Sequence, residues 1–383
     1  MVPLDEPNRK RKRSQKARFI YGSIFLLMNL MAWFARDYGH KFFPNLHYFT
    51  ACGNGENDCS HTMGVLRVSF GCFIFFSSMF LSTVKTSKLY EARNSWHSNY
   101  WSLKIVLLII SLAISFFCPP VFIQLYGEVA RIGAGVFLLL QLVSVIHFIS
   151  WMDNYWMPEE KLRRSCFLGL CMSTIFYIAS ISGIVLMYLL YVQRLTCAVN
   201  IVFITWTAVL FLVVMIVTLH SKANKGLLSS GMIGLYIIFL CWSAIRSEPT
   251  NWKCNPQSGI ASNGDWVSVL GFLFAIGVIV MATFSTGIDS KSFKFYRNEV
   301  EQEYDIPYKY GFFHMVFTLG AMYFAMLFVN WHLHRPTQKW IIDYGWASTW
   351  VKIINEWLAV TIYLWKLIYP VARQTRIMDH EMP

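Results

Sequence analysis

The chain has 383 residues, of which 56% are hydrophobic, 17% aromatic and only 14% charged, and its mean hydropathy is +0.44. So little polar surface excludes a soluble globular protein of this size and predicts a polytopic membrane protein. The net charge of +12 does not indicate nucleic-acid binding. Its basic residues lie mostly in short loops beside apolar segments and form no recognisable binding module.

The first apolar segment follows a strongly basic N-terminus. Seven Lys or Arg residues lie between Arg9 and Arg18, and the apolar run extends from Phe19 to Ala35. The core of a secretory signal usually has about 7 to 15 residues and ends at a small-residue cleavage site. This run is longer and ends in AWFARDYGH. We therefore predict an uncleaved first span whose N-terminus lies in the cytosol.

Ten apolar segments succeed one another along the chain. Each is long enough to cross a bilayer, or nearly so when aromatic residues at its ends count as interfacial anchors. Ten spans place both termini on the same side. The segments are Phe19 to Ala35, Gly64 to Val84, Trp101 to Cys118, Val129 to Met152, Cys166 to Val192, Val199 to Leu219, Ser230 to Arg246, Val267 to Thr286, Phe312 to Trp331 and Trp350 to Pro370.

Loop charge supports this topology. About 22 basic residues, Lys104 among them, lie on the proposed cytosolic side, against about eight on the outside, which include Arg36 and Arg131. An excess of Lys and Arg is typical of cytosolic loops. Merging two segments into a nine-span arrangement inverts every later loop and removes the bias. We therefore predict a multi-pass protein of the endomembrane system (ER or Golgi) or plasma membrane, with both termini cytosolic.

The fourth apolar segment is longer than a bilayer crossing requires. The stretch from Glu128 to Asn154 comes after the helix-stopping pair Pro119-Pro120 and carries Arg131, Gln141 and His147. A crossing of about 30 Å needs about 20 helical residues, so this segment either tilts strongly or projects from the membrane.

Four of the nine cysteines lie in the proposed exoplasmic loops. We expect two disulfides there, most simply Cys52 with Cys59 and Cys197 with Cys254, although the sequence allows three pairings. A metal site is the alternative, but the spacing of its ligands fits no standard zinc pattern. Its ligands would be His40, His47, Cys52, Cys59 and His61.

Charged residues inside the spans need partners or water, because a charge at the bilayer centre costs at least about 2.5 kcal/mol. Lys352 and Glu356 can pair on one helix face at i,i+4, and Lys366 lies further along that span. Arg67, about one turn into the second span, admits a structural or a functional role, while Arg131 with Glu128 suits an interfacial anchor.

Enzyme signatures are missing from the sequence. It has no Walker-type phosphate loop, no HExxH, no GxSxG and no paired acidic motif for a divalent metal. We predict no catalytic residue, no metal and no cofactor. Basic cytosolic residues such as KTSK at Lys85 to Lys88 suit anionic headgroups, but the positive-inside bias predicts the same residues.

Several stretches resemble the serine incorporator family, also called the TMS membrane protein family, and they extend from the second span to the tenth. They are RVSF at Arg67 to Phe70, VKTSK at Val84 to Lys88, LLQLVSVIHFISWMDN in the long span, FYIASI at Phe176 to Ile181, GLLSSGMIGLYIIFLCWSAIRSEP at Gly226 to Pro249, CNP at Cys254 to Pro256, YKYGFFH at Tyr308 to His314, and WVKI and YLWKLIYP in the last span.

This resemblance implies an all-α protein with ten transmembrane helices in two bundles, bridged by a long diagonal fourth helix. It also implies a non-enzymatic role in incorporating serine into phosphatidylserine and sphingolipids, with phospholipid binding and scrambling. Many members carry Asp where this chain has His147, so no role for an acid transfers to that position. The candidates for lining an interbundle groove for phospholipid headgroups are Arg67, Gln141, His147, Lys352 and Glu356.

Expected partners are phospholipids and sphingolipids, with serine and lipid-synthesis enzymes as further candidates, and no nucleic acid. Two alternative functions are a secondary carrier of serine and a scaffold for lipid-synthesis enzymes. A carrier would be favoured by broken helices in inverted repeats, but the glycines of the seventh and eighth spans show no repeat signal. We divide the chain into segments 1–18, 19–118, 119–165, 166–246, 247–311 and 312–383.

Overall fold

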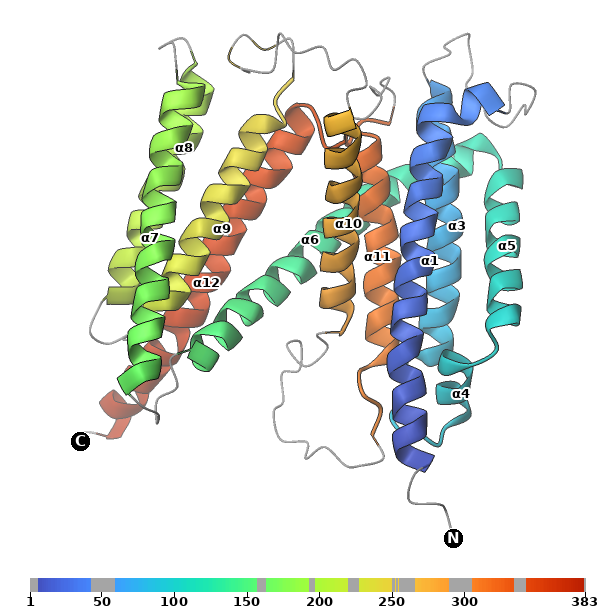
Figure 1. Ribbon diagram of the computed structural model, residues 1–383, viewed down its shortest axis with the longest axis horizontal. Coiled ribbons are helices and arrows are strands. Elements are labelled where there is room, and N and C mark those ends of the chain that lie inside the picture. The colour runs from blue at the N-terminus through green and yellow to red at the C-terminus, as the bar shows by residue number, and fades with distance from the viewer. Residues whose placement is uncertain are drawn as a thin grey trace. The chain divides into compact units, whose positions relative to one another are not determined.

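The structure, a computed structural model, describes residues 6–42, 59–156, 163–192, 197–219, 227–249, 252, 254, 266–288, 305–333 and 342–381. Every regular element in these ranges is a helix, and one isolated β-bridge joins Lys88 to Asp305. The helices are α1 (Glu6–Phe42), α3 (Cys59–Thr83), α4 (Ala92–Ser98), α5 (Trp101–Phe117), α6 (Pro120–Trp156), α7 (Arg163–Tyr191), α8 (Ala198–Leu219), α9 (Leu227–Arg246), α10 (Trp266–Ile288), α11 (Tyr310–Phe328) and α12 (Trp346–Glu381) (Figure 1).

Each of the ten predicted apolar segments lies in or overlaps one of these helices, which confirms the predicted all-α membrane fold. Among the described residues, seven helices are long and apolar enough to cross a membrane. The pair α4 and α5, bent by 72°, makes an eighth if it is one span. The described part of α10 is a shorter apolar helix, and α12, which carries Lys352, Glu356 and Lys366, is not among the seven. The count of ten spans therefore stays a prediction.

The chain divides into two compact units, each built from segments distant in sequence. The first unit comprises residues 1–141 and 262–343. Its most extensive helix contacts are those of α3 with α11, α1 and α5. Aromatic rings fill its core: Phe25 packs edge-on against Phe317 with ring centroids 4.9 Å apart, and Phe76 contacts both. Such pairs add to the packing free energy beyond the area that they bury.

The second unit comprises residues 142–261 and 344–383. Helix α9 packs against α7, α8 and α12, and its fully buried side chains include Ile233, Ile237 and Ile245. Small residues let α9 approach its neighbours closely, as is common between membrane helices. A Cβ atom at Gly234, for example, would lie 2.5 Å from the ring of Phe211 on α8.

Helix α6 contributes residues to both units, because the boundary between them falls after Gln141. It has 37 residues and begins at Pro120, where the fixed φ of proline suits the first helical turn. At 1.5 Å per residue it is about 55 Å long, well beyond the thickness of a bilayer core. The predicted surplus length is therefore present, and the predicted diagonal brace between two bundles stays a prediction.

Candidate functional site

Arg67 of α3 is fully buried in the first unit and binds the C-terminal end of α5. Its Nη1 donates to the backbone carbonyls of Ser115, Phe116 and Cys118 at 2.7, 2.9 and 2.8 Å. The last carbonyls of a helix have no partner within the helix and carry its negative dipole end, so a guanidinium is well suited to this position. Of the two roles that the sequence left open for Arg67, these contacts support the structural one.

A second buried polar group in the first unit joins α1, α4 and α11. His97 Nδ1 lies 3.1 Å from His314 Nε2, and His97 Nε2 lies 2.9 Å from the hydroxyl of Tyr308. Burial raises the pKa of Tyr308 well above its ordinary value, so this hydroxyl keeps its proton and donates a hydrogen bond to the carbonyl of Ser14. The hydroxyl must then accept from His97 Nε2, which makes His97 Nδ1 the acceptor for His314.

Lys104 lies in the first turn of α5, within the predicted third span, and its assignment to the cytosolic side stays a prediction. It is fully buried and donates from Nζ to the carbonyl of His97 at 2.8 Å. Its ammonium also lies 4.2 Å from the ring centroid of Trp101 and 5.2 Å from that of Tyr21. Cation–π contacts of this kind stabilise a buried ammonium, so α4 and these rings replace the water that a loop would supply.

Arg36 lies in a helix and not in a loop. The charge pattern placed it in an outside loop, but the structure buries it at the end of α1 with Asp37, whose Oδ1 lies 2.7 Å from its Nε. Arg131, by contrast, is partly exposed and pairs with Glu128 at 2.7 Å, as its three-residue spacing suggested.

One face of α12 carries a series of polar side chains through the second unit. Thr349, Lys352, Glu356, Tyr363 and Lys366 are separated by three, four, seven and three residues, so they share one side of the helix. From the first to the last the helix rises about 25 Å, close to the thickness of a bilayer core. We call this set the α12 polar face.

Lys352 and Glu356 do not form the pair that their i,i+4 spacing allows. Lys352 Nζ instead donates to the carbonyl of Ser243 at 3.3 Å and to Ser247 Oγ at 2.6 Å, at the C-terminal end of α9. Glu356 is fully buried, and its Oε1 lies 2.8 Å from Thr207 Oγ1 of α8. The neighbouring helices supply partners that the sequence of α12 alone does not reveal.

A second buried carboxyl lies just beyond α9. Glu248 is fully buried, and the amide of Asn200, oriented with its nitrogen toward the carboxyl, donates to Oε1 at 2.5 Å and to Oε2 at 3.2 Å. Burial raises the pKa of Glu248 to about 7, and the Asn200 hydrogen bond opposes that shift. Cys241 of α9 lies close enough to Glu248 and Glu356 for both carboxyls to affect its thiol. These groups form a polar cluster inside the unit.

Further along α12, hydroxyl groups continue the polar face. The hydroxyl oxygen of Tyr363 lies 3.1 Å from Ser229 Oγ, and Lys366 Nζ donates to Ser150 Oγ of α6 at 2.7 Å. Each polar side chain of this face therefore has a polar neighbour on another helix or at its end. The face offers hydrogen-bonding groups at several depths of the unit.

The predicted groove residues are distributed over the two units. Arg67 and Gln141 belong to the first unit, and His147, Lys352 and Glu356 to the second. Gln141 and His147 are partly exposed on α6. Sequence reasoning missed His97, His314, Thr207 and Glu248, of which only Glu248 carried a visible signal, as a carboxyl directly after an apolar span.

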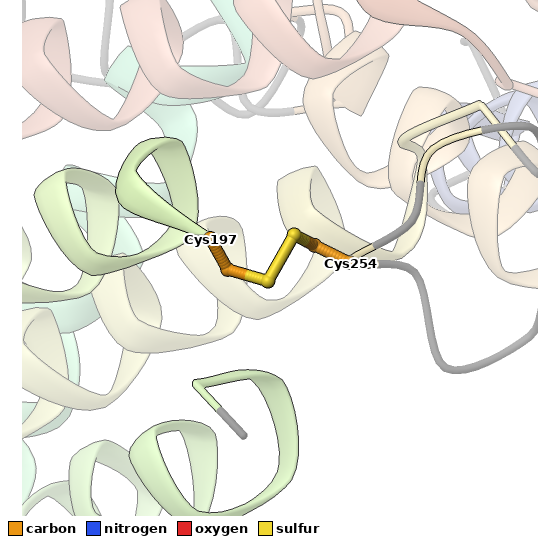
Figure 2. The surroundings of a disulfide bond; sticks show 2 residues. All are labelled: Cys197 and Cys254. Carbon is orange, nitrogen blue, oxygen red and sulfur yellow. A yellow bond between two sulfur atoms is a disulfide. The ribbon is translucent and has the colours of Figure 1, made fainter. Parts of the chain in front are cut away.

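A disulfide joins Cys197 to Cys254, which is the simplest pairing expected from the sequence (Figure 2). It connects the residue before α8 to the segment after α9, so it fixes neighbouring ends of two antiparallel helices. The other expected pair involves Cys52 and the side chain of Cys59, which lie outside the described residues. The same holds for the side chains of the alternative metal site.

The sequence matches known proteins over most of its length. The family model described as serine incorporator matches residues 6–305 and 296–376. The chain belongs to the serine incorporator family. A "Probable serine incorporator" of Dictyostelium discoideum is 27% identical over 96% of this chain and 96% of its own length. Serine incorporator 3 of Bos taurus is 26% identical over 82% and 79%, and serine incorporator 5 of Danio rerio 24% identical over 94% and 92%.

The serine incorporator match covers segments of both units and includes the whole α12 polar face. The buried carboxyls and the Arg67 contacts therefore lie within the matched part of the chain and not in an added region.

Proposed function

We propose that this serine incorporator is a non-enzymatic lipid-handling protein that binds phospholipids and moves them between leaflets, in connection with serine incorporation into phosphatidylserine and sphingolipids. The α12 polar face is the observation that supports the proposal. A phospholipid crosses a bilayer slowly because its polar headgroup must enter hydrocarbon without hydrogen bonds. Polar side chains at successive depths lower that cost while the acyl chains stay in lipid, and no nucleophile is needed.

Thr207 and Glu356 face inward in the structure, where α8 and α9 cover them. Passage of a headgroup along this face therefore requires one of these helices to move away. Helix α12 packs more extensively on α9 than on α8, so we expect the contact between α8 and α12 to open. The hydrogen bond between Thr207 and Glu356 is the polar contact that this opening breaks.

The test uses purified protein in liposomes that contain an NBD-labelled phospholipid in both leaflets. Dithionite bleaches only label that it can reach, so we expect bleaching beyond the outer-leaflet fraction. Replacing Lys352 by Met should slow the bleaching of label that starts in the inner leaflet, because it removes a charged group from the α12 polar face. Thr361→Val is the matched control, since Thr361 lies exposed on the opposite side of the same helix.

Bleaching that stops at the outer-leaflet fraction would contradict lipid scrambling. The same liposomes loaded with buffer and offered labelled serine distinguish the carrier alternative, because serine uptake without scrambling would favour a carrier. Equal bleaching rates in Lys352→Met and Thr361→Val would leave scrambling intact and remove the α12 polar face as its path.

A further inference from the structure

We propose that Glu356 is a proton-binding site inside the second unit, and that its carboxyl is protonated while α8 and α9 cover it. The ligand is the proton itself. The inference does not depend on lipid scrambling, because it concerns the charge state of one side chain and is measured without lipid transport.

None of the described residues forms an ion pair with Glu356. The side chain has no exposed surface. Its Oε1 contacts Thr207, while its Oε2 has no hydrogen-bond partner in the part of the chain that the structure describes. An ionised carboxylate leaves this second oxygen with a large uncompensated desolvation cost, whereas the carbonyl oxygen of a neutral acid loses much less.

The hydroxyl of Thr207 provides an independent geometric argument. Thr207 Oγ1 lies 2.8 Å from the carbonyl of Phe203, one turn earlier on α8, and 2.8 Å from Glu356 Oε1. A hydroxyl has a single hydrogen to donate. If Thr207 donates to Phe203, its oxygen can only accept from Glu356, and that requires a proton on Oε1. Protonation of Glu356 therefore satisfies both contacts at once.

A metal cation is a poorer occupant than a proton. Calcium takes six to eight oxygen ligands, and magnesium prefers six. Around Glu356 the contacts supply one hydroxyl, from Thr207, and the nearby group on α9 is the thiol of Cys241. A proton needs only the single acceptor that Thr207 offers.

The groups beside Glu356 also indicate how the unit responds when the proton leaves. They are Thr207 of α8 and the thiol of Cys241 of α9, and Glu248, just after α9, lies on the far side of that contact as a second neighbour of Cys241. The cation nearest along α12 is Lys352, one turn earlier on the same face, where it binds Ser243 and Ser247 at the end of α9. Pairing with an ionised Glu356 would draw Lys352 from that position. Proton release and the Lys352 contact with α9 are therefore expected to be coupled.

Infrared difference spectroscopy of the purified full chain tests the charge state directly. At neutral pH, wild type minus Glu356→Gln should contain the C=O band of one protonated carboxyl per chain, and this band should shift in heavy water. Glu248→Gln is the matched control for a second buried carboxyl nearby, and Glu128→Gln for an exposed one. The band assigned to Glu356 should persist in both.

Thr207→Val gives a second measurement that leaves Glu356 in place. If Glu356 is protonated, its O–H loses an acceptor and the C=O band moves to higher frequency. The proposal would be overturned if Glu356→Gln instead removed the bands of an ionised carboxylate at neutral pH, or if Thr207→Val changed only carboxylate bands. Both outcomes are readable in folded protein, because neither substitution changes side-chain size substantially.

Discussion

Replacing Arg67 by Met should destabilise the first unit strongly. Its Nη1 carries two hydrogens and faces three carbonyls of α5 within 2.9 Å, so it makes about two full charge-assisted hydrogen bonds. Each such bond contributes about 1.5–3 kcal/mol, so two of them contribute about 3–6 kcal/mol. We therefore expect Arg67→Met to lower the free energy of unfolding by about 3–6 kcal/mol.

Thermal unfolding in detergent can be followed with a thiol-reactive fluorescent dye. Cys72 is buried in the same unit and becomes reactive when the helices separate. Arg131→Met is the matched control, because Arg131 is partly exposed and its pair with Glu128 contributes less than about 1 kcal/mol. Arg67→Lys should fall between the two, since it keeps the charge and loses the planar fork. Equal unfolding midpoints for Arg67→Met and Arg131→Met would refute this account of the α5 terminus.

Stability should fall as pH rises through neutrality because of Glu248, whose pKa burial raises from 4.5 to about 7. The folded state binds this proton more tightly than the unfolded state, so the stabilisation from protonated Glu248 is complete below about pH 4.5 and is lost as pH rises to about 7. Between these pH values the unfolding temperature of wild type should therefore fall relative to that of Glu248→Gln. Gly311→Ala should destabilise, because its Cβ would lie 2.6 Å from Val84 Cα, whereas Gly135→Ala meets no atom within 4 Å and should be neutral or stabilising in the same melts. Cys197→Ser opens a link between residues 57 apart and should cost up to about 4 kcal/mol, with reductant lowering the wild-type midpoint to that of the variant; a reductant-insensitive wild type would contradict the link.

The helices could be predicted from the sequence because a membrane span imposes a length and an apolar composition on one continuous segment. Helix α4 could not, since its seven residues, ARNSWHS, carry no such pattern and depend on contacts with α1 and α3. The disulfide between Cys197 and Cys254 was predictable from the loops in which its cysteines lie. The span count and the sidedness of the loops stay predictions.

The candidate site was predictable as residue types and not as contacts. The spacing of Lys352 and Glu356 places them on one face of α12. The sequence does not show that each of them binds a group of α8 or α9 in place of the other. The burial of Lys104 could not be predicted for a related reason: hydropathy identifies a basic residue near a span end, whereas its burial depends on the rings of Trp101 and Tyr21 around it.

The hydrogen bonds of Ser14 bear on how the chain is made. Ser14 contacts Tyr308 and Tyr310, so partners almost 300 residues apart meet in the first unit. Ribosomes deliver the chain from its N-terminus, and the whole of residues 142–261 emerges before α11. The second unit likewise lacks α12 until translation is nearly finished. During synthesis, therefore, Ser14 enters the membrane region before the tyrosines that it contacts in the folded unit. A chain truncated before α11 and α12 completes neither unit.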